Sequence, residues 1–146
     1  MRISTRSRYG LRLMLSLAGN FKKGYMLLKD IARHEEISEK YLSLIVIPLR
    51  KAGLLVSSRG ANGGYSLSKP PSEISLKEII EPLEGDLDVI ECIKGKEVCD
   101  KSSTCPSHDI WALLGDRIAD FLDTITLEDL LKMQKEKAAG LLEYII

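Results

Sequence analysis

The sequence has no run of apolar residues close to the roughly 18 that a membrane-spanning helix needs, and it has no repeats or low-complexity segments. Cysteine is also scarce, with 3 in 146 residues, and an odd number of cysteines cannot form a complete disulfide framework. These absences argue against a membrane, repeat or disulfide-stabilised secreted protein and favour a cytoplasmic protein with reduced thiols. The remaining composition, 45% hydrophobic and 29% charged residues, is typical of a soluble globular domain with its own core.

Charge is unevenly distributed along the chain, although the net charge is zero. Residues 1–69 carry 13 Lys or Arg against 4 Asp or Glu, a net charge of +9. Residues 70–146 carry 8 Lys or Arg against 17 Asp or Glu, a net charge of −9. A basic half joined to an acidic half predicts a surface that binds a polyanion. Packing of the two halves against each other is the simpler alternative.

Residues 28–51 have the pattern of a helix-turn-helix, preceded by a helix over residues 7–19. A short helix from residue 28 ends near residue 34, and after a tight connection Ser38 stands where the N-cap of a second helix belongs. Pro48 lies inside this second helix. Its ring clashes with the carbonyl four residues earlier, so we expect a bend or an early end there. Gly53 follows as the glycine that ends the helix.

Residues 54–68 predict a β-hairpin. Two short strands, at 54–58 and 65–68, enclose a tip whose Asn62–Gly63 step and further glycines permit positive φ angles. A helix-turn-helix followed by such a hairpin with a basic residue at its tip is a winged helix. A nucleotide-phosphate loop is disfavoured, because this glycine-rich segment leads into a strand rather than into the N-terminus of a helix.

The part of the chain after the wing is expected to be helical apart from one long loop. Ser75 and Glu78 form the capping box of a short helix that we expect to stop near Pro82. Residues 84–107 are poor in apolar side chains and are expected to form a loop, and a long helix follows over residues 109–125.

The helix over residues 109–125 carries a continuous apolar stripe flanked by charged residues. It has more apolar surface than so small a winged domain can cover, so we expect it to pack on a second copy as well as on its own chain. The expected dimer-interface residues are Ile110, Leu114, Ile118, Phe121, Leu122 and Ile125. A purely internal core helix is the alternative. A last helix is expected through Leu130, Leu131 and Met133. The end of this helix and the residues after it, 132–146, are assigned to a C-terminal tail rich in helix-forming residues.

All three cysteines and one of the two histidines fall within residues 92–108, as Cys92, Cys99, Cys105 and His108. Three thiols and an imidazole suit zinc or an iron–sulfur cluster. The wide gaps between the cysteines favour a cluster over zinc, whose paired ligands usually stand two to four residues apart. A disulfide with a spare thiol, inert surface cysteines and a thiol redox sensor remain open. An enzyme using Cys105 and His108 as a nucleophilic pair is disfavoured, because no orienting Asn or Asp pattern is evident.

Several motifs together resemble the Rrf-two (Rrf2) family of bacterial winged-helix regulators, and in particular its iron–sulfur cluster regulator (IscR-like) branch. The resemblance covers residues 1–131 and rests on the following motifs: MRIS (1–4), RYGLR (8–12), ISEKYL (37–42), LRKAGL (49–54), RGANGGY (59–65) and CPSHD (105–109). The family implies a homodimer that binds operator DNA and holds a cluster in the cysteine loop, here residues 92–108. In the IscR-like branch three cysteines and a histidine hold a 2Fe-2S cluster, and the matching residues are Cys92, Cys99, Cys105 and His108.

The chain departs from the IscR-like pattern in two places. The gap between the first two cysteines is one residue longer, and Ser43 and Leu44 stand where that branch carries Glu and Gln in the recognition helix. Base preference therefore does not transfer. In the nitric-oxide-sensing branch an acidic residue of the partner subunit is a ligand, at the position where this chain has Arg8. The Arg8 cation is a poor ligand for a metal cluster, so the IscR-like branch is preferred and the nitric-oxide-sensing branch is the alternative.

We therefore expect a mainly helical fold with a small β-hairpin wing and a long C-terminal dimerisation helix. The protein is expected to be a dimeric, cytoplasmic transcriptional regulator without enzyme activity or a small-molecule substrate. The residues expected to contact double-stranded operator DNA are Ser38, Lys40, Tyr41, Ser43, Arg50 and Arg59. A 2Fe-2S cluster is expected to report iron–sulfur cluster status or redox state, with cluster-biogenesis genes as targets. The alternatives are a nitric-oxide- or iron-sensing regulator with a 4Fe-4S cluster, and a zinc- or thiol-based regulator of the same fold.

Overall fold

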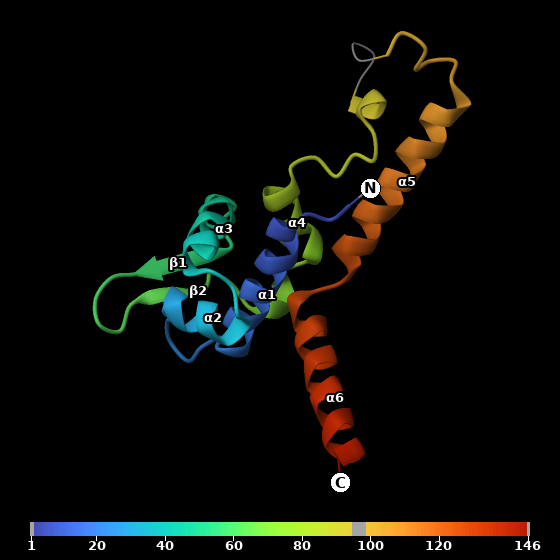
Figure 1. Cartoon of the computed structure of the whole chain (residues 1–146). Helices are drawn as coiled ribbons and strands as arrows, with labels where there is room; N and C mark the ends of the chain where they lie inside the picture. Colours follow the sequence, from blue (N-terminus) through green and yellow to red (C-terminus); the bar gives the residue numbers. More distant parts are fainter. Residues whose placement is uncertain (1, 95–98, 146) are drawn as a thin grey trace.

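The computed structural model describes residues 2–94 and 99–145, which are mainly helical with one two-stranded antiparallel sheet. In chain order the described elements are α1 (Thr5–Gly19), α2 (Leu28–Glu35), α3 (Glu39–Lys51), β1 (Leu55–Ser58), β2 (Gly64–Leu67), the 3-10 turn η1 (Pro71–Glu73), α4 (Leu76–Glu84), the 3-10 turn η2 (Glu91–Lys94), α5 (Pro106–Thr124) and α6 (Leu127–Ile145). The predicted fold class is confirmed. Helices α1–α4 and the hairpin form one body, α5 extends on the side away from the hairpin, and α6 projects past the body (Figure 1). In the part of the chain described, no helix is long and apolar enough to cross a membrane.

Helices α2 and α3 form the helix-turn-helix, joined by the tight turn that the sequence predicts. Glu36 adopts the left-handed conformation, with φ 55°, and ends α2. The backbone N–H of Ile37 then donates to the carbonyl of Ala32 at 3.0 Å, and the Ile37 side chain is buried. The Ser38 hydroxyl accepts from the N–H of Tyr41 at 3.4 Å, which confirms the predicted N-cap of α3.

Two prolines lie inside helices. Helix α3 continues through Pro48 to Lys51, without the early end that was one of the two outcomes expected there. Helix α4 ends at Glu84, two residues after Pro82 and so near the expected stop. Pro48 cannot donate to the carbonyl of Leu44, but Leu44 lies on the exposed side of the helix, where water can replace the missing bond. Ile45 and Leu49, buried on either side of the proline, hold both halves of α3 on the core.

The hairpin β1–β2 is anchored to the connection between α1 and α2. Leu55 pairs with Leu67 at its base, and both are buried. Tyr65 and Met26 exchange two backbone hydrogen bonds, of 2.8 and 2.9 Å. Gly64, with φ 128°, approaches the Met26 carbonyl so closely that a Cβ has no room there. The wing therefore has a fixed position beside the helix-turn-helix.

The hydrophobic core lies between α1, α2, α3 and α4 and includes the start of α6. Its largest buried apolar side chains are Leu13, Met14, Leu17, Ile31, Leu42, Ile45, Leu49, Ile74, Ile79 and Leu127. The junction of α5 and α6 is tied to the start of α4 by two backbone hydrogen bonds of 2.9 Å, from the Leu76 N–H to the Ile125 carbonyl and from the Leu127 N–H to the Ile74 carbonyl. The capping box of Ser75 and Glu78 is confirmed at the same place. The C-terminal end of α5 is therefore bonded directly to the core.

Two boundaries in the C-terminal half differ from those expected. Helix α5 begins at Pro106, three residues before the expected start at residue 109, because a proline in the first turn is already set to a helical φ and its missing N–H has no helical partner to lose. Helix α6 continues through most of the segment that was expected to be a tail, 132–146. Residues 95–98 of the expected loop over 92–108 lie outside the described residues.

Candidate nucleic-acid interface and cysteine segment

Helix α3 presents a row of exposed side chains along the face opposite the core. The row consists of Lys40, Leu44, Ile47 and Lys51, at spacings of four, three and four residues. Arg50 is exposed as well. The structure therefore surrounds two apolar side chains with cations, and sequence reasoning had assigned no role to Leu44 or Ile47.

The two serines predicted to contact DNA already have backbone partners. The hydroxyl of Ser38, which is exposed, caps the helix by accepting from Tyr41. The hydroxyl of Ser43 donates to the Lys40 carbonyl at 2.5 Å. Ser43 is half-buried, and because its proton is engaged, its hydroxyl is left to accept hydrogen bonds.

The wing adds a further cation beside α3. Arg59 is exposed at the start of the hairpin tip, and β1 packs against α3. In Figure 1 the hairpin projects from the same body as α3, on the side away from α5. Glu39 is the acidic residue in the first turn of α3, where it stabilises the helix N-terminus. The exposed cations of the helix and the wing have the chemistry that binds phosphates.

A polar network behind α3 joins α1 to the turn of the helix-turn-helix. The ring of Tyr9 meets that of Tyr41 edge-on, with centroids 5.7 Å apart, and the Arg12 guanidinium lies 5.7 Å from the Tyr9 ring. Arg12 Nε donates to Glu35 Oε2 at 3.0 Å, and Ser16 Oγ donates to Glu35 Oε1 at 2.7 Å. The orientation of α3 is therefore coupled to α1 through side chains.

The environment of Glu35 keeps it ionised. Partial burial acts to raise the pKa of this carboxyl, but the hydrogen bonds from Ser16 and Arg12 outweigh it and leave the pKa below its ordinary value. Sequence reasoning missed this residue, because its partners stand 23 and 19 residues earlier in the chain.

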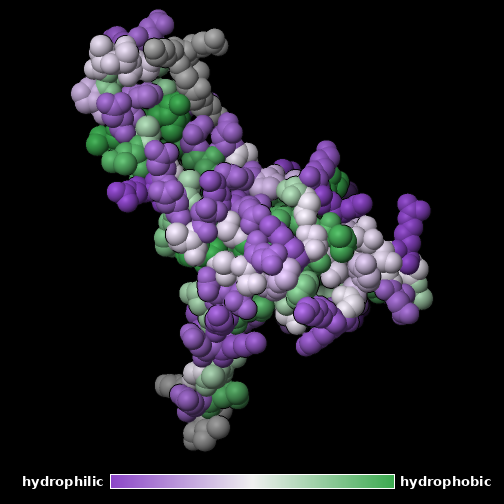
Figure 2. All heavy atoms as spheres, turned by 180° about the vertical axis from the view of Figure 1, so that it is seen from behind, coloured by the Kyte–Doolittle hydropathy of each residue, from purple (hydrophilic) through white to green (hydrophobic). Residues whose placement is uncertain are grey.

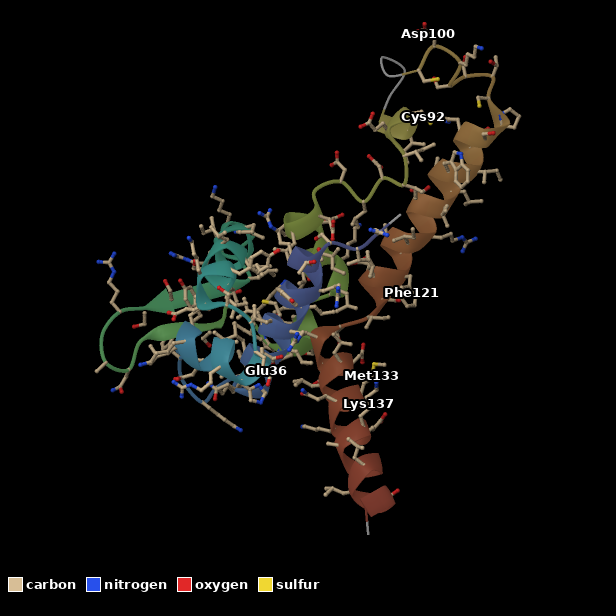
Figure 3. The ribbon with its side chains drawn as sticks, in the orientation of Figure 1. Glu36, Cys92, Asp100, Phe121, Met133 and Lys137 are labelled. Atoms are coloured by element: carbon tan, nitrogen blue, oxygen red, sulfur yellow. The ribbon has the colours of Figure 1, made fainter. Side chains whose placement is uncertain are left out.

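The described parts of the cysteine segment (residues 92–108), which are 92–94 and 99–108, lie at the end of the molecule away from the wing (Figure 3). Cys92 lies in η2, Cys99 follows the undescribed residues, and Cys105 is the N-cap of α5. All three thiols are free and half-buried. His108 lies in the first turn of α5, where its N–H donates to the Cys105 carbonyl at 3.1 Å and its Nδ1 lies 3.3 Å from Asp109 Oδ1.

The predicted ligand set fits a soft metal or cluster by its chemistry but is not assembled. Free thiols and an imidazole are the donors that zinc and iron–sulfur centres use. Within residues 2–94 and 99–145, no three side chains of His, Cys, Asp or Glu are close enough together to hold a metal ion. Binding by Cys92, Cys99, Cys105 and His108 therefore requires these side chains to stand closer together than they do in the described parts of the chain.

Part of the predicted dimer stripe packs on its own chain. Leu122 and Ile125 contact the core. Ile118 is half-buried and lines, with Leu122 and Ile3, a hollow of about 240 Å³. Ile118, Leu122 and Ile125 therefore contribute to the fold of the single chain.

The rest of the stripe is exposed. Ile110 and Phe121 are 58% and 61% exposed, and Leu114 is exposed with them. Leu113, which the sequence analysis did not single out, joins the same surface. Seen from behind, hydrophobic side chains gather along the part of α5 that leaves the body (Figure 2). A helix with one face on its own core and another open apolar face is suited to packing against a second copy.

Comparison with known proteins places these features in a family. The family model described as Rrf2, iron-dependent transcriptional regulator, matches residues 3–133. CymR of Bacillus subtilis (strain 168), an HTH-type transcriptional regulator, is 41% identical over 130 residues, which are 89% of each chain. Its solved structure, described as the global cysteine regulator of B. subtilis, matches with a TM-score of 0.75 at 39% identity, over 91% of this chain and 98% of that one.

IscR proteins are similar to a comparable degree. The HTH-type transcriptional regulator IscR of Pectobacterium carotovorum subsp. carotovorum (strain PC1) is 38% identical over 130 residues, 89% of this chain and 79% of that protein. The solved structure of T. potens IscR matches with a TM-score of 0.76 at 36% identity, over 94% of this chain and 90% of that one. The similarity therefore extends to two differently named regulators.

Proposed function

The chain belongs to the Rrf2 family of transcriptional regulators, and we propose that it binds double-stranded operator DNA in the cytoplasm as a homodimer. The observation that carries this proposal is the exposed face of α3, which bears Lys40, Arg50 and Lys51 beside the Arg59 of the wing. In helix-turn-helix proteins the second helix enters the major groove, and cations around it bind phosphates.

The exposed face of α5 supports the homodimer. A two-fold dimer presents two copies of α3 to half-sites about one helical turn apart, so the operator is palindromic. Phe121 and Ile110 supply the apolar area, and their partner is the same face of the second copy.

The test of DNA binding is selection from a random duplex library by the full chain, followed by fluorescence anisotropy on the selected duplex. Replacing Lys40 and Lys51 together by Ala weakens binding and lowers the slope of log affinity against log salt by about 1 for each phosphate that is no longer neutralised. Lys137→Ala, on the projecting part of α6, is the control for the removal of a surface cation. Failure to enrich any sequence, or equal slopes for all variants, contradicts the proposal.

We further propose that Cys92, Cys99, Cys105 and His108 hold a 2Fe-2S cluster and that the regulated genes serve iron–sulfur cluster biogenesis. Support comes from the donor chemistry and from the similarity to IscR. Such a cluster supplies a centre whose presence and oxidation state follow iron and oxidants.

The chain itself provides a route from this segment to the DNA-binding body. Cys105 is the N-cap residue of α5 and His108 stands in its first turn, so ligation by this pair connects the cluster directly to the start of the helix. The other end of α5 is bonded to α4 through Leu76 and Ile125. Gain or loss of the cluster therefore biases the position of α5 relative to the helix-turn-helix.

A thiol-based regulator is the second candidate, and the state of the cysteines favours it. The three cysteines are free and half-buried. The similarity to CymR supports the same candidate. In this case oxidation of the thiols, rather than cluster loss, changes the cysteine segment.

Anaerobic purification followed by iron, acid-labile sulfide and zinc analysis separates these candidates. Iron and sulfide in equal amounts, at two per chain, support the 2Fe-2S cluster, and four of each per chain support the 4Fe-4S alternative. One zinc per chain in a colourless protein supports a zinc site. A colourless protein with neither metal, whose DNA affinity changes on oxidation, supports the thiol-based candidate.

A further inference from the structure

The exposed face of α3 has an apolar centre. Leu44 is 51% exposed and Ile47 is 49% exposed, whereas the apolar residues on the inner face of the same helix, such as Leu42 and Ile45, are buried. These two side chains therefore lie outside the core, on the helix that faces DNA in the proposed function.

The polar and charged residues of this face stand around its centre, and Leu44 and Ile47 occupy the centre itself. Lys40 and Lys51 stand at its two ends. The hydroxyl of Ser43, beside Leu44, already donates its hydrogen bond to the backbone carbonyl of Lys40. The side chains that usually read guanine or adenine by paired hydrogen bonds are Arg, Lys, Asn and Gln. On this face they occur as lysines at its two ends, positions 40 and 51, and not at positions 44 and 47.

We propose that Leu44 and Ile47 contact the 5-methyl groups of thymines in the major groove and so set the base preference of this regulator; this inference rests on the proposed operator binding. The thymine methyl is the apolar group that a base pair presents in the major groove, and apolar side chains are its usual partners. Lys40 and Lys51 then meet phosphates at the edges of the groove, which is about 12 Å wide.

The spacing along the helix sets where the thymines lie. Three residues of α-helix rise about 4.5 Å, while base pairs stack about 3.4 Å apart. Leu44 and Ile47 therefore meet methyl groups on neighbouring base pairs, on the same or opposite strands. The expected half-site contains two adjacent A·T pairs beneath α3.

The experiment removes single methyl groups from DNA. Each thymine of one half-site in the library-selected operator is replaced by deoxyuridine, which differs only by lacking the methyl, and affinity of the full chain is measured by anisotropy at constant salt. We expect about fourfold weaker binding at each of two neighbouring positions, the loss that follows from leaving one apolar carbon in water. The other thymines of the half-site serve as internal controls.

Variants assign each methyl to its residue. Leu44→Ala and Ile47→Ala bind the thymine operator more weakly and lose the response to deoxyuridine at one position each, while keeping it at the other. Leu141→Ala, which shortens a 63% exposed leucine near the end of α6, keeps both responses. Because Leu44 and Ile47 are exposed, the thermal midpoints of their variants, recorded by circular dichroism, match that of the unaltered chain.

Two different failures are distinguishable. If the chain binds its operator specifically but no deoxyuridine substitution changes the affinity, or if both alanine variants keep the full response, the methyl-reading inference is overturned and operator binding stands. If the random library yields no specific duplex, operator binding itself is contradicted, and the inference falls with it.

Discussion

The guanidinium of Arg12, on α1, binds the carboxylate of Glu35, the last residue of α2, with 3.0 Å between Nε and Oε2. The same guanidinium also donates to the Glu35 carbonyl, which would otherwise be an unpaired end group of α2. Arg12 thus fixes the point at which the chain turns toward α3. Ser16 holds the second carboxylate oxygen.

Glu35→Gln is expected to lower the free energy of unfolding by about 1–2 kcal/mol at neutral pH, because a half-buried network loses its charged acceptor. Because the folded state lowers the Glu35 pKa, its contribution is present above the ordinary carboxyl pKa and is lost as pH falls through the lower folded value. Urea unfolding at a series of pH values measures the difference between variant and unaltered chain. Glu136→Gln, on the exposed part of α6, is the control, and a difference that does not shrink in acid contradicts the assignment.

Arg59→Ala is expected to weaken binding to the selected operator by about 1–3 kcal/mol if the wing enters a groove. The loss follows from the exposed position of Arg59 at the hairpin tip. Anisotropy titration at constant salt measures it, with Lys137→Ala as the control. Unchanged affinity for Arg59→Ala removes Arg59 from the DNA interface.

Phe121→Asp is expected to convert the dimer into a monomer at micromolar concentration, because it places a charge in an apolar face. Phe121 is 61% exposed in the single chain, so the fold of the monomer is retained. Sedimentation velocity without DNA reports the oligomeric state. Val56→Asp, on the wing, places the same charge on an exposed apolar residue and should leave the dimer intact. A chain that is already monomeric before substitution contradicts the prediction.

His108→Ala is expected to change the visible and electron-paramagnetic spectra of the anaerobic protein and to lower its iron content. The imidazole stands in the first turn of α5, three residues after Cys105, and is the neutral donor of the proposed ligand set. His34→Ala, which removes the other histidine, in the last turn of α2, leaves both spectra unaltered. An unaltered spectrum with full iron content in His108→Ala means that a different group is the fourth ligand.

Local signals in the sequence predicted the elements well. Ser38 and the pair Ser75 and Glu78 act within three residues of themselves, so short motifs identify the caps that the structure confirms. Pro48 shows the limit of such rules, because packing on either side of a proline can outweigh its local cost.

The remaining features depend on contacts between distant parts of the chain. The Glu35 network joins residues up to 23 positions apart, and no periodicity reports it. The exposure of Leu44 and Ile47 follows from which face of α3 the core takes. The chain between Cys92 and Cys105 has few apolar residues, and its sequence therefore carries no pattern that predicts how the two thiols are placed. The sequence predicted which residue types could be ligands but not their geometry.

The most direct test of the account is the affinity of the full chain for its selected operator and for a shuffled duplex of the same composition, measured from about 50 to 200 mM salt. The account predicts that the operator binds at least about a thousandfold more tightly than the shuffled duplex, and that both affinities fall steeply with salt through release of counterions from the phosphates. Equal affinity for the two duplexes, or an affinity independent of salt, would contradict operator recognition by α3 and the wing.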